Sequence, residues 1–418
     1  MIERTYSRAS KRLLAATLFL GGSLAASACG GTPDSEEVAT TRQKIINGED
    51  STDAQDAAVL LFHVSKTNQI ASCTGTLIAP NLVLTARHCV SKVTEAAFGC
   101  DGEGNAYPPG TPGAQAGDDL AADGFYVFTG KDSPFGNGTL HRKPAGIGKK
   151  VFHDDASVLC SHDLALVLLQ EDVPGALIAP VNLTRELEAG ETITAVGWGL
   201  TEEGQTPNQR MQRTGVAITQ VGPFEGKGAN PAVPPNDFSV GEAICSGDSG
   251  GPAISETTGA VIGVVSRGGN GSSSTQPGAT CIGARAVNNY TKVAPFRDLI
   301  LEALDEAGYS AWEEGGPNPA LGAGGVACSD NAECQSNSCG GGKCVEACSA
   351  AGTCSSGKIC TEVEGGKACT PDPAAKKDDS GCSTSTTGSS TSVSTLGALF
   401  GLAALVATRR RSVRGEAR

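Results

Sequence analysis

One serine in a glycine-rich segment carries the clearest chemical signal in the sequence. It is Ser249, in Cys-Ser-Gly-Asp-Ser-Gly-Gly-Pro at 245–252. A serine hydroxyl is a weak nucleophile until a base takes its proton, and the oxyanion that then forms needs backbone N–H donors. Gly247 and Gly250 permit the sharp turn that would present both the hydroxyl and such donors. The segment therefore predicts a serine hydrolase, provided that a histidine and an acid accompany Ser249.

The order of these partners along the chain separates three kinds of hydrolase. All histidines precede Ser249; they are His63, His88, His141, His153 and His162. The segment 247–251 fits the G-x-S-x-G elbow of α/β-hydrolases, but that fold needs its histidine after the serine. The subtilisin order would need an early acid at Asp50, Asp53 or Asp56, and none of these lies in a recognisable motif. The order that remains is histidine, aspartate, serine.

Two segments supply a suitable histidine and acid. His88 ends the apolar run Leu-Val-Leu-Thr-Ala-Arg-His-Cys at 82–89, and Asp163 opens the apolar strand Asp-Leu-Ala-Leu-Val-Leu-Leu at 163–169. The other four histidines are interpreted as structural.

Together these segments resemble the trypsin/chymotrypsin-type serine proteases, from Ile45 to about Leu304. The matching motifs are T-A-A-H-C at 85–89 (with Arg87 in place of the second alanine), D-I-A-L at 163–166 (with Leu164 in place of the isoleucine), G-W-G at 197–199, C-x-G-D-S-G-G-P at 245–252 and Y-T-K-V at 290–293. The resemblance implies an all-β fold of two six-stranded antiparallel β-barrels with a C-terminal helix. The alternating residues 192–196 favour a strand and 295–304 favour that helix.

The resemblance also implies the role of each residue. Ser249 would attack the carbonyl carbon while His88 takes its proton, and Asp163 would hold the imidazole in the useful tautomer, as in the worked example for this family. The N–H groups of Gly247 and Ser249 would form the oxyanion hole. Ser266 matches the serine that supports the buried aspartate.

A basic segment, Arg-Gln-Lys-Ile-Ile-Asn-Gly at 42–48, resembles the family's activation site. Cleavage after Lys44 would free the ammonium of Ile45 to pair with Asp248, beside the nucleophile. Asn47 stands where the family has a glycine. The alternative is an exposed basic loop that is not processed.

The family reads the side chain before the cut in a pocket whose floor lies six residues before the serine. Here that residue is Ala243, followed by Ile244, with Asn288 near the base and Gly268 on an open wall. Without a carboxylate at the floor, binding lysine or arginine there is unfavourable. We expect apolar or aromatic preference, unless a shifted loop brings in Glu242. Arg267 replaces the tryptophan usual before Gly268.

The sixteen cysteines divide into groups. The resemblance implies the pairs Cys73–Cys89 and Cys245–Cys281, which leaves Cys100 and Cys160 to pair. The Gly-, Pro- and Ala-rich stretch 101–123 is predicted to be a loop insertion that either shapes substrate access or is solvated filler.

Eight cysteines lie within 328–370. A segment so short cannot form a hydrophobic core large enough to hold it folded, so we predict a module that is stabilised by disulfides. Zinc binding is the alternative, but the segment has no C-x-x-C. The spacing loosely resembles Dickkopf-type repeats and would serve as a partner-binding unit or a spacer.

Both ends of the chain have the features of targeting segments. Basic residues, an apolar stretch at 13–24 and Ala-Ser-Ala-Cys at 26–29 are typical of a secretory signal, ending in ordinary cleavage or in lipidation at Cys29. The tail has Cys382, an apolar run at 396–407 and an arginine cluster. It resembles myxobacterial C-terminal sorting tails, and the alternative is a single-pass anchor.

The predicted organisation follows from these segments. It is a signal peptide at 1–28, a propeptide at 29–44, a trypsin-like serine protease domain at 45–308, a linker at 309–327, the Cys-rich disulfide module at 328–370, a low-complexity linker at 371–394 and a sorting or membrane segment at 395–418.

We expect a secreted, surface-anchored serine endopeptidase, made as a zymogen, that acts on protein or peptide substrates. The net charge of −13 argues against nucleic acid as a partner. We expect a monomer, an activating protease as partner, no cofactor and no metal; nothing in the loops supports a structural calcium site. The alternative from another class is a catalytically silent protease-fold protein that acts in surface adhesion or binding.

Overall fold

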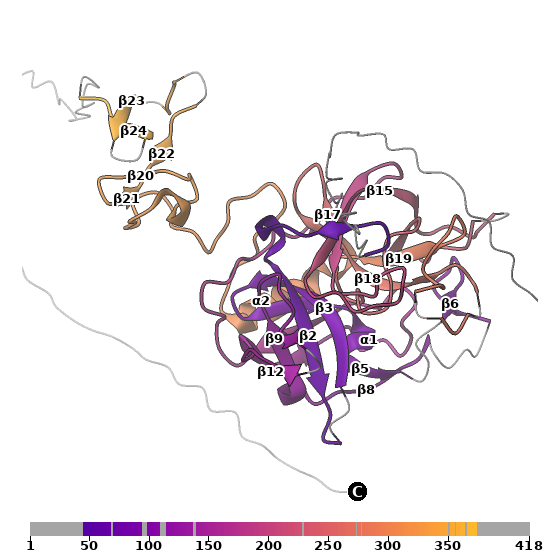
Figure 1. The fold of residues 1–418 in the computed structure, drawn as a ribbon. Helices are drawn as coiled ribbons and strands as arrows, with labels where there is room; N and C mark the ends of the chain where they lie inside the picture. Colours follow the sequence, from indigo (N-terminus) through magenta and orange to yellow (C-terminus); the bar gives the residue numbers. More distant parts are fainter. Residues whose placement is uncertain are drawn as a thin grey trace, which may run out of the picture. The chain divides into compact units, whose positions relative to one another are not determined.

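The computed structural model describes residues 45–67, 70–93, 98–108, 114–136, 139–227, 230–272, 274–276, 278–349, 352–355, 357–363 and 366–373. These residues form two units, divided between Ala323 and Gly324 (Figure 1). Each unit is described by itself.

The first half of the larger unit is a closed six-stranded antiparallel barrel. Its strands run in the order β12, β13, β4, β3, β2, β9. Their bounds are β2 (Ala58–Val64), β3 (Ile70–Ala79), β4 (Leu82–Thr85), β9 (Phe125–Phe128), β12 (Gly146–Phe152) and β13 (Ala165–Leu169). The apolar residues of these strands fill the barrel, where Leu61, Leu77, Val83 and Val167 are almost completely buried. Burial of this apolar area is the main force that holds the strands together.

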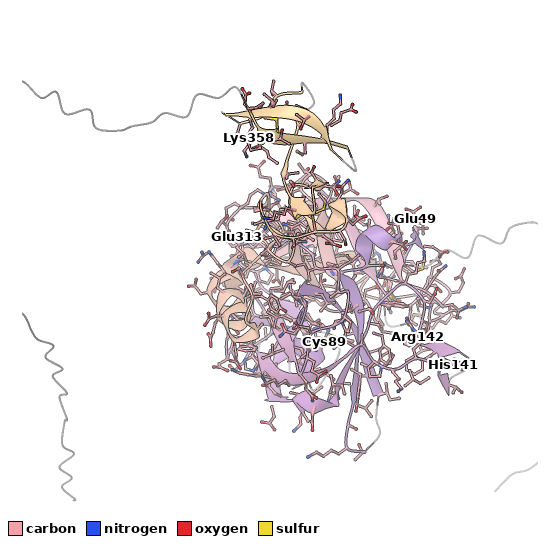
Figure 2. All side chains as sticks on the ribbon, turned by 90° about the vertical axis from the view of Figure 1, so that its left-hand side faces the viewer. Glu49, Cys89, His141, Arg142, Glu313 and Lys358 are labelled. Carbon is pink, nitrogen blue, oxygen red and sulfur yellow. A yellow bond between two sulfur atoms is a disulfide. The ribbon has the colours of Figure 1, made fainter. Side chains whose placement is uncertain are left out.

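The second half is another six-stranded antiparallel barrel, which the pairing of its strands β15 and β16 closes. The strands are β14 (Thr192–Gly197), β15 (Met211–Val221), β16 (Asp237–Val240), β17 (Pro252–Ser255), β18 (Val261–Gly269) and β19 (Val287–Lys292), with β1 (Glu49–Asp50) added at the edge of β15. Inside it, the rings of Phe238 and Tyr290 stack at 5.2 Å. Figure 2 shows the side chains on the ribbon, with the buried Cys89 in the larger unit and the exposed Arg142 near the edge of that unit.

Helix α2 (Arg297–Ala307) follows the second barrel and begins directly after a 3₁₀ turn at Ala294–Phe296. Ile300, Ala303, Leu304 and Ala307 recur at helical spacing and are buried in a core shared with both barrels. Gly308 ends the helix in the left-handed conformation, with φ of 83°. The predicted all-β fold of two six-stranded barrels with a C-terminal helix is confirmed.

Short elements connect these strands. They are α1 (Arg87–Val90), β5 (Ser91–Val93), β6 (Gly99–Cys100), β7 (Ala106–Tyr107), β8 (Ala116–Asp119), β10 (Phe135–Gly136), β11 (Thr139–Leu140) and 3₁₀ turns at Asp53–Gln55 and Ala122–Gly124. A further 3₁₀ turn, Asn331–Glu333, lies in the smaller unit.

The segment after α2 continues the larger unit, although the sequence suggests a linker from residue 309. Val181 N donates to Trp312 O, and Glu314 N donates to Val181 O, both at 2.9 Å. Arg185 adds an ion pair to Glu314 at 3.2 Å. Residues 309–316 therefore pack on the barrels.

The described residues of the smaller unit form five short strands: β20 (Cys339–Gly340), β21 (Lys343–Cys344), β22 (Glu346–Ala347), β23 (Lys358–Val363) and β24 (Gly366–Pro371). Its disulfides are Cys328–Cys339, Cys334–Cys344, Cys348–Cys360 and Cys354–Cys369. Each half of the unit thus contains two crossed disulfides, the first cysteine paired with the third and the second with the fourth. Because all eight sulfurs are paired, none is a thiolate that could bind zinc.

Several predictions fall outside the described residues: the signal peptide, the propeptide with Cys29 and Lys44, and the tail with Cys382. Among the described residues, the structure contains no helix of the length and apolar character needed to cross a bilayer.

Candidate active site

His88 and Asp163 meet because neighbouring strands lead to them. Strand β4 pairs with β13, with Thr85 opposite Ala165, so the residues just beyond this pair are brought together. His88 lies on α1, and its Nδ1 is 2.8 Å from Asp163 Oδ2. The His88 backbone N–H also donates to Asp163 Oδ1, at 2.9 Å. The carboxylate thus fixes both the ring and the backbone of the histidine.

Asp163 is completely buried and needs this shell of donors. Ser266 Oγ adds a third hydrogen bond, at 2.6 Å. Burial raises the pKa of Asp163, but the charge of His88 and these hydrogen bonds outweigh that effect and hold the pKa below its usual value. Burial lowers the pKa of His88, but the charge and hydrogen bond of Asp163 dominate and raise it above its ordinary value. The pair therefore favours a carboxylate beside an imidazole of increased basicity.

Ser249 lies in the tight turn between β16 and β17. Its carbonyl oxygen accepts a hydrogen bond from Thr74 N at 2.8 Å, which ties the turn to the first barrel. The next residue must be glycine, because a Cβ at Gly250 would lie 2.1 Å from Thr85 Oγ1. Ser249 itself is partly exposed. Among the described residues no hydrogen bond joins Ser249 to His88; such bonds are often long without substrate and tighten in the complex.

Some backbone N–H groups of this turn donate hydrogen bonds within the protein, and others do not. Asp248 N, Gly250 N and Gly251 N donate to carbonyl oxygens of the protein. Within the described chain, the amides of Gly247 and Ser249 donate no hydrogen bond. Two free N–H groups beside a serine hydroxyl are the arrangement that an oxyanion requires.

Asp248 is buried behind the turn without a counter-charge. Its carboxylate accepts hydrogen bonds from Gly199 N at 2.7 Å and Cys245 N at 2.9 Å. Any side chain at Gly197 or Gly199 would strike it, because a Cβ there would lie 2.2 or 2.3 Å from its oxygens. Burial outweighs these hydrogen bonds and raises the pKa of Asp248 to about 7. The G-W-G motif therefore makes room for a carboxylate that lacks a cation.

Ile45 and Ile46 are fully buried in the uncleaved chain. Ile45 has a φ of 45°, which is strained for a β-branched residue. Ile46 packs with Leu200 and the Cys245–Cys281 disulfide, and its carbonyl accepts from Arg213 Nη1 at 2.9 Å.

Asn47 is held by a carboxylate that the sequence did not connect with it. Its Nδ2 donates to Glu242 Oε1, and the other oxygen of Glu242 accepts from Gly283 N. Arg213 Nη1 lies 3.7 Å from the same carboxylate. Asn47 also adopts a left-handed φ of 57°, which asparagine tolerates better than most residues. Glu242 is therefore engaged by the activation segment instead of entering the substrate pocket.

The predicted pocket residues lie at the turn before Ser249 and on two strands. Ala243 and Ile244 are buried, and Asn288 donates from Nδ2 to Gly241 O at 2.7 Å. Asn288 Oδ1 has no partner among the described residues and fills the space next to Gly268, where a Cβ would lie 2.0 Å from it. Ser266 directs its hydroxyl to Asp163, so it supports the acid and does not offer a polar group to the pocket.

Arg267 forms contacts that the sequence did not reveal. Its Nη1 is 2.7 Å from the completely buried Asp237 Oδ2. Its guanidinium also lies 5.4 Å from the ring centre of Phe98. A buried ion pair thus takes the position where the family has tryptophan.

The predicted insertion packs beside the site. The Cys100–Cys160 disulfide ties its β6–β7 hairpin to the segment that precedes Asp163. At its other end β8 pairs with β5, which directly follows α1. Arg87 Nε donates to Ser91 Oγ, which donates to Asp119 Oδ1 on β8. The departure at Arg87 therefore fastens the helix that carries His88 to the insertion.

The two remaining predicted disulfides have good geometry for bonding. Cys73–Cys89 and Cys245–Cys281 have Cα–Cα distances of 6.2 and 5.4 Å. The first anchors α1 beside His88, and the second anchors the turn before Ser249.

A double barrel that carries a His–Asp pair with a buried carboxylate, together with a glycine-flanked serine turn, defines the class of chymotrypsin-like proteins. The trypsin family model matches residues 45–103 and 131–300, which is more than half of the chain. The chain therefore belongs to the trypsin family. The unmatched stretch between these ranges contains most of the insertion.

Several known proteins are similar to this chain. Phenoloxidase-activating factor 1 of Holotrichia diomphalia is 29% identical over 280 residues, covering 62% of this chain and 69% of that protein. A trypsin of Saccharopolyspora erythraea is 26% identical over 271 residues, covering 62% of this chain and 98% of that protein. The vitellin-degrading protease of Bombyx mori is 25% identical over 274 residues, covering 62% and 86%.

Proposed function

We propose that this protein is a secreted serine endopeptidase that hydrolyses peptide bonds through an acyl-enzyme at Ser249. The observation that carries the proposal is the 2.8 Å contact between His88 Nδ1 and the buried Asp163 carboxylate. A carboxylate at Nδ1 leaves Nε2 as the ring nitrogen that can accept a proton.

The reaction divides into two acyl transfers. His88 takes the proton of Ser249 as the hydroxyl oxygen attacks the substrate carbonyl, and then gives that proton to the leaving amine. The free amides of Gly247 and Ser249 stabilise the oxyanion of each tetrahedral intermediate. Water, activated by the same histidine, then releases the acyl group.

The enzyme is made as a zymogen that cleavage after Lys44 activates. The unpaired Asp248 and the strained Ile45 support this proposal. Cleavage gives Ile45 an ammonium group that can neutralise Asp248. It also frees the φ torsion of Ile45, because that torsion is defined by the carbonyl carbon of the preceding residue.

The pocket before the cut accepts apolar or aromatic side chains, because Ala243 and Asn288 give it no charge. Lys44 is then a poor site for self-cleavage, so another protease activates the zymogen. One relative, phenoloxidase-activating factor 1, is itself named for the activation of another protein.

We further propose that the protein acts at the cell surface, where its tail retains it through Cys382. The seven disulfides among the described residues are consistent with an oxidising compartment. The smaller unit would then separate the protease from its anchor.

The test is an assay of a chain that begins at Ile45 and ends at Ala323, with Ser249→Ala as control. We expect hydrolysis of peptides with phenylalanine or leucine before the cut, and its loss in the control. A folded chain with the correct N-terminus and no hydrolysis would support the silent binding protein instead. A strong arginine preference before the cut would overturn the pocket assignment.

A further inference from the structure

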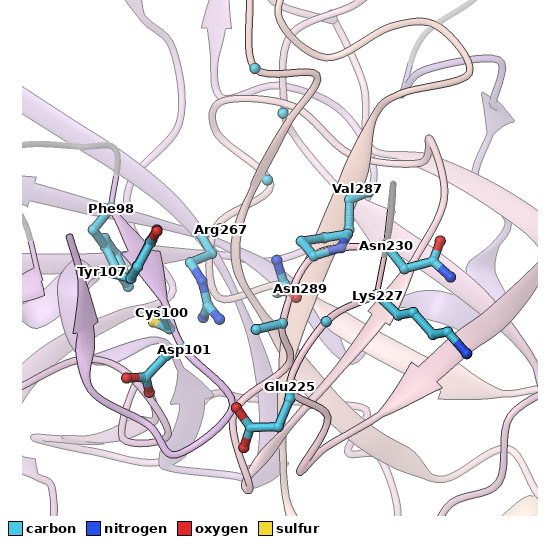
Figure 3. Close-up of a pocket in the computed structure, with 17 residues that line it drawn as sticks. Phe98, Cys100, Asp101, Tyr107, Glu225, Lys227, Asn230, Arg267, Val287 and Asn289 are labelled. Carbon is cyan, nitrogen blue, oxygen red and sulfur yellow. The ribbon is translucent and has the colours of Figure 1, made fainter.

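A cavity of about 810 Å³ lies beside the candidate active site (Figure 3). Its walls come from the insertion hairpin, from residues 225–227 and 230–232, and from the ends of β18 and β19. Arg267 and Gly268, which line it, directly follow Ser266, the partner of Asp163. A peptide that reaches Ser249 along the end of β18 would pass this cavity, which we call the Glu225 chamber.

The positive charge of Arg267 in the chamber wall is already balanced. Arg267 pairs with the buried Asp237 and lies over the ring of Phe98. Lys227 also lines the chamber, but Figure 3 shows its ammonium directed away from Glu225 and Arg267. Neither cation is therefore arranged to dominate the recognition of a ligand.

The chamber is also lined by hydrogen-bond acceptors. Among the described residues, the carboxylate of Glu225 forms no hydrogen bond or ion pair. Asp101 adds a second carboxylate, whose pKa is lowered by hydrogen bonds from the backbone and side chain of Asn105, so it remains ionised. Asn289 Oδ1 is a buried acceptor with no partner in the described chain.

The rest of the chamber suits a long side chain. Tyr107 is 62% exposed at its rim and offers an aromatic face. Gly102 brings the insertion loop against Glu225, since a Cβ at Gly102 would lie 2.8 Å from Glu225 Cδ. An aromatic face near a free carboxylate can pack against methylene groups and attract a cation.

We propose that the Glu225 chamber binds a lysine or arginine side chain of the substrate, upstream of the residue that precedes the cut. Glu225 is the specificity-determining residue. The inference rests on the proposed peptidase function and adds a basic preference that the uncharged pocket at Ala243 does not provide. The overall charge of −13 also favours approach of basic substrates.

The experiment compares otherwise identical peptides with alanine, arginine, lysine or glutamate at each of the upstream positions, using the full chain after cleavage at Lys44. At one position arginine and lysine should raise kcat/KM by about fivefold over alanine. The gain should shrink when salt is raised from about 0.05 M to about 0.5 M. Glu225→Gln should abolish the gain and leave hydrolysis of the all-alanine peptide unchanged. The matched control is Glu302→Gln, an exposed glutamate on α2.

Binding gives a readout that does not depend on catalysis. Calorimetry on full-length Ser249→Ala protein should show tighter binding of the arginine peptide, and Glu225→Gln in that background should remove the difference. Equal turnover and binding of all peptides, or a preference for glutamate through Arg267, would overturn the chamber assignment. Loss of hydrolysis with every peptide, but with the binding preference intact, would overturn the peptidase and keep the chamber.

Discussion

Asp163 sets the basicity of His88, and this contact has a measurable consequence. Only the neutral imidazole can act as base, and its pKa is raised above the ordinary 6.5. We therefore expect the acidic limb of kcat/KM to lie above pH 6.5. Asp163→Asn should lower kcat by a factor of about 10⁴, as the same substitution does in the family's archetype. It should also move the acidic limb of the kcat/KM profile to lower pH. A pH–rate profile measures both effects.

The matched control for this prediction is Asp154→Asn, which disturbs the neighbouring pair of Asp154 with His162. That variant should leave the limb in place. If Asp163→Asn left the limb unchanged, a group other than His88 would control the activity.

Asp248 makes the stability of the uncleaved chain depend on pH. Its folded pKa of about 7 exceeds the ordinary 3.8, so the folded state holds more protons than the unfolded state between these values. The free energy of unfolding should thus fall as pH rises from about 4 to about 7, by roughly 4 kcal/mol at most. Denaturant unfolding at several pH values measures this slope.

Two comparisons test whether Asp248 causes this dependence of the free energy of unfolding on pH. Asp248→Asn in the uncleaved chain should flatten it, because the amide carries no charge. Cleavage after Lys44 should flatten it as well, because the Ile45 ammonium would keep Asp248 ionised. A slope that survives in Asp248→Asn would have to come from other carboxyl groups.

At the scale of elements, the activation segment is held by both the conformation and the side chain of Asn47. Asn47→Gly should keep the left-handed turn and lose the bond to Glu242, whereas Asn47→Ala should lose both. We expect losses of about 1 kcal/mol and about 2 kcal/mol in the free energy of unfolding of the cleaved enzyme. Glu242→Ala removes the acceptor and should destabilise the enzyme at least as much as Asn47→Gly. If all three variants were as stable as the unsubstituted enzyme, the segment would be held by Ile45 and Ile46 alone.

The sequence predicted those elements whose signals are local. Apolar runs marked strands such as β4 and β13, and short motifs around His88, Asp163 and Ser249 indicated the candidate triad. The pairing of Asn47 with Glu242 could not be predicted in this way, because the two residues are 195 positions apart and the activation-site motif around Asn47 carries no signal for Glu242. Arg267 with Asp237 is a similar case, since a buried ion pair leaves no periodic signal.

Two segments were hard to interpret for another reason. The insertion is rich in glycine, proline and alanine, and residues 309–316 combine glycine and polar residues with Tyr309 and Trp312. The order of both segments comes from contacts with distant strands. Composition alone cannot show such contacts. The structure shows them through the Cys100–Cys160 disulfide, the β5–β8 pairing and the bonds of Val181.

For the whole molecule, these contacts predict where the protease can be truncated. A chain ending at Ala323 should keep the stability and activity of the full protease unit. A chain ending at Gly308 loses the hydrogen bonds to Val181 and the Arg185–Glu314 pair, so it should be less stable by about 2–3 kcal/mol. Thermal melting of the two chains, with the full chain as reference, measures the difference. Equal melting temperatures would make residues 309–316 a simple linker.

The crossed disulfides of the smaller unit also determine how it would respond to mechanical tension. A force applied between Cys328 and Cys344 follows the covalent path through the Cys328–Cys339 bond and then only residues 339–344. The Cys334–Cys344 bond closes the remaining loop, and the second half of the unit repeats this pattern. Most of the backbone is therefore shielded from the load. Under shear flow the smaller unit would keep a nearly constant length, because its disulfides limit how far the chain can extend. A chain of the same size without disulfides would stretch several-fold.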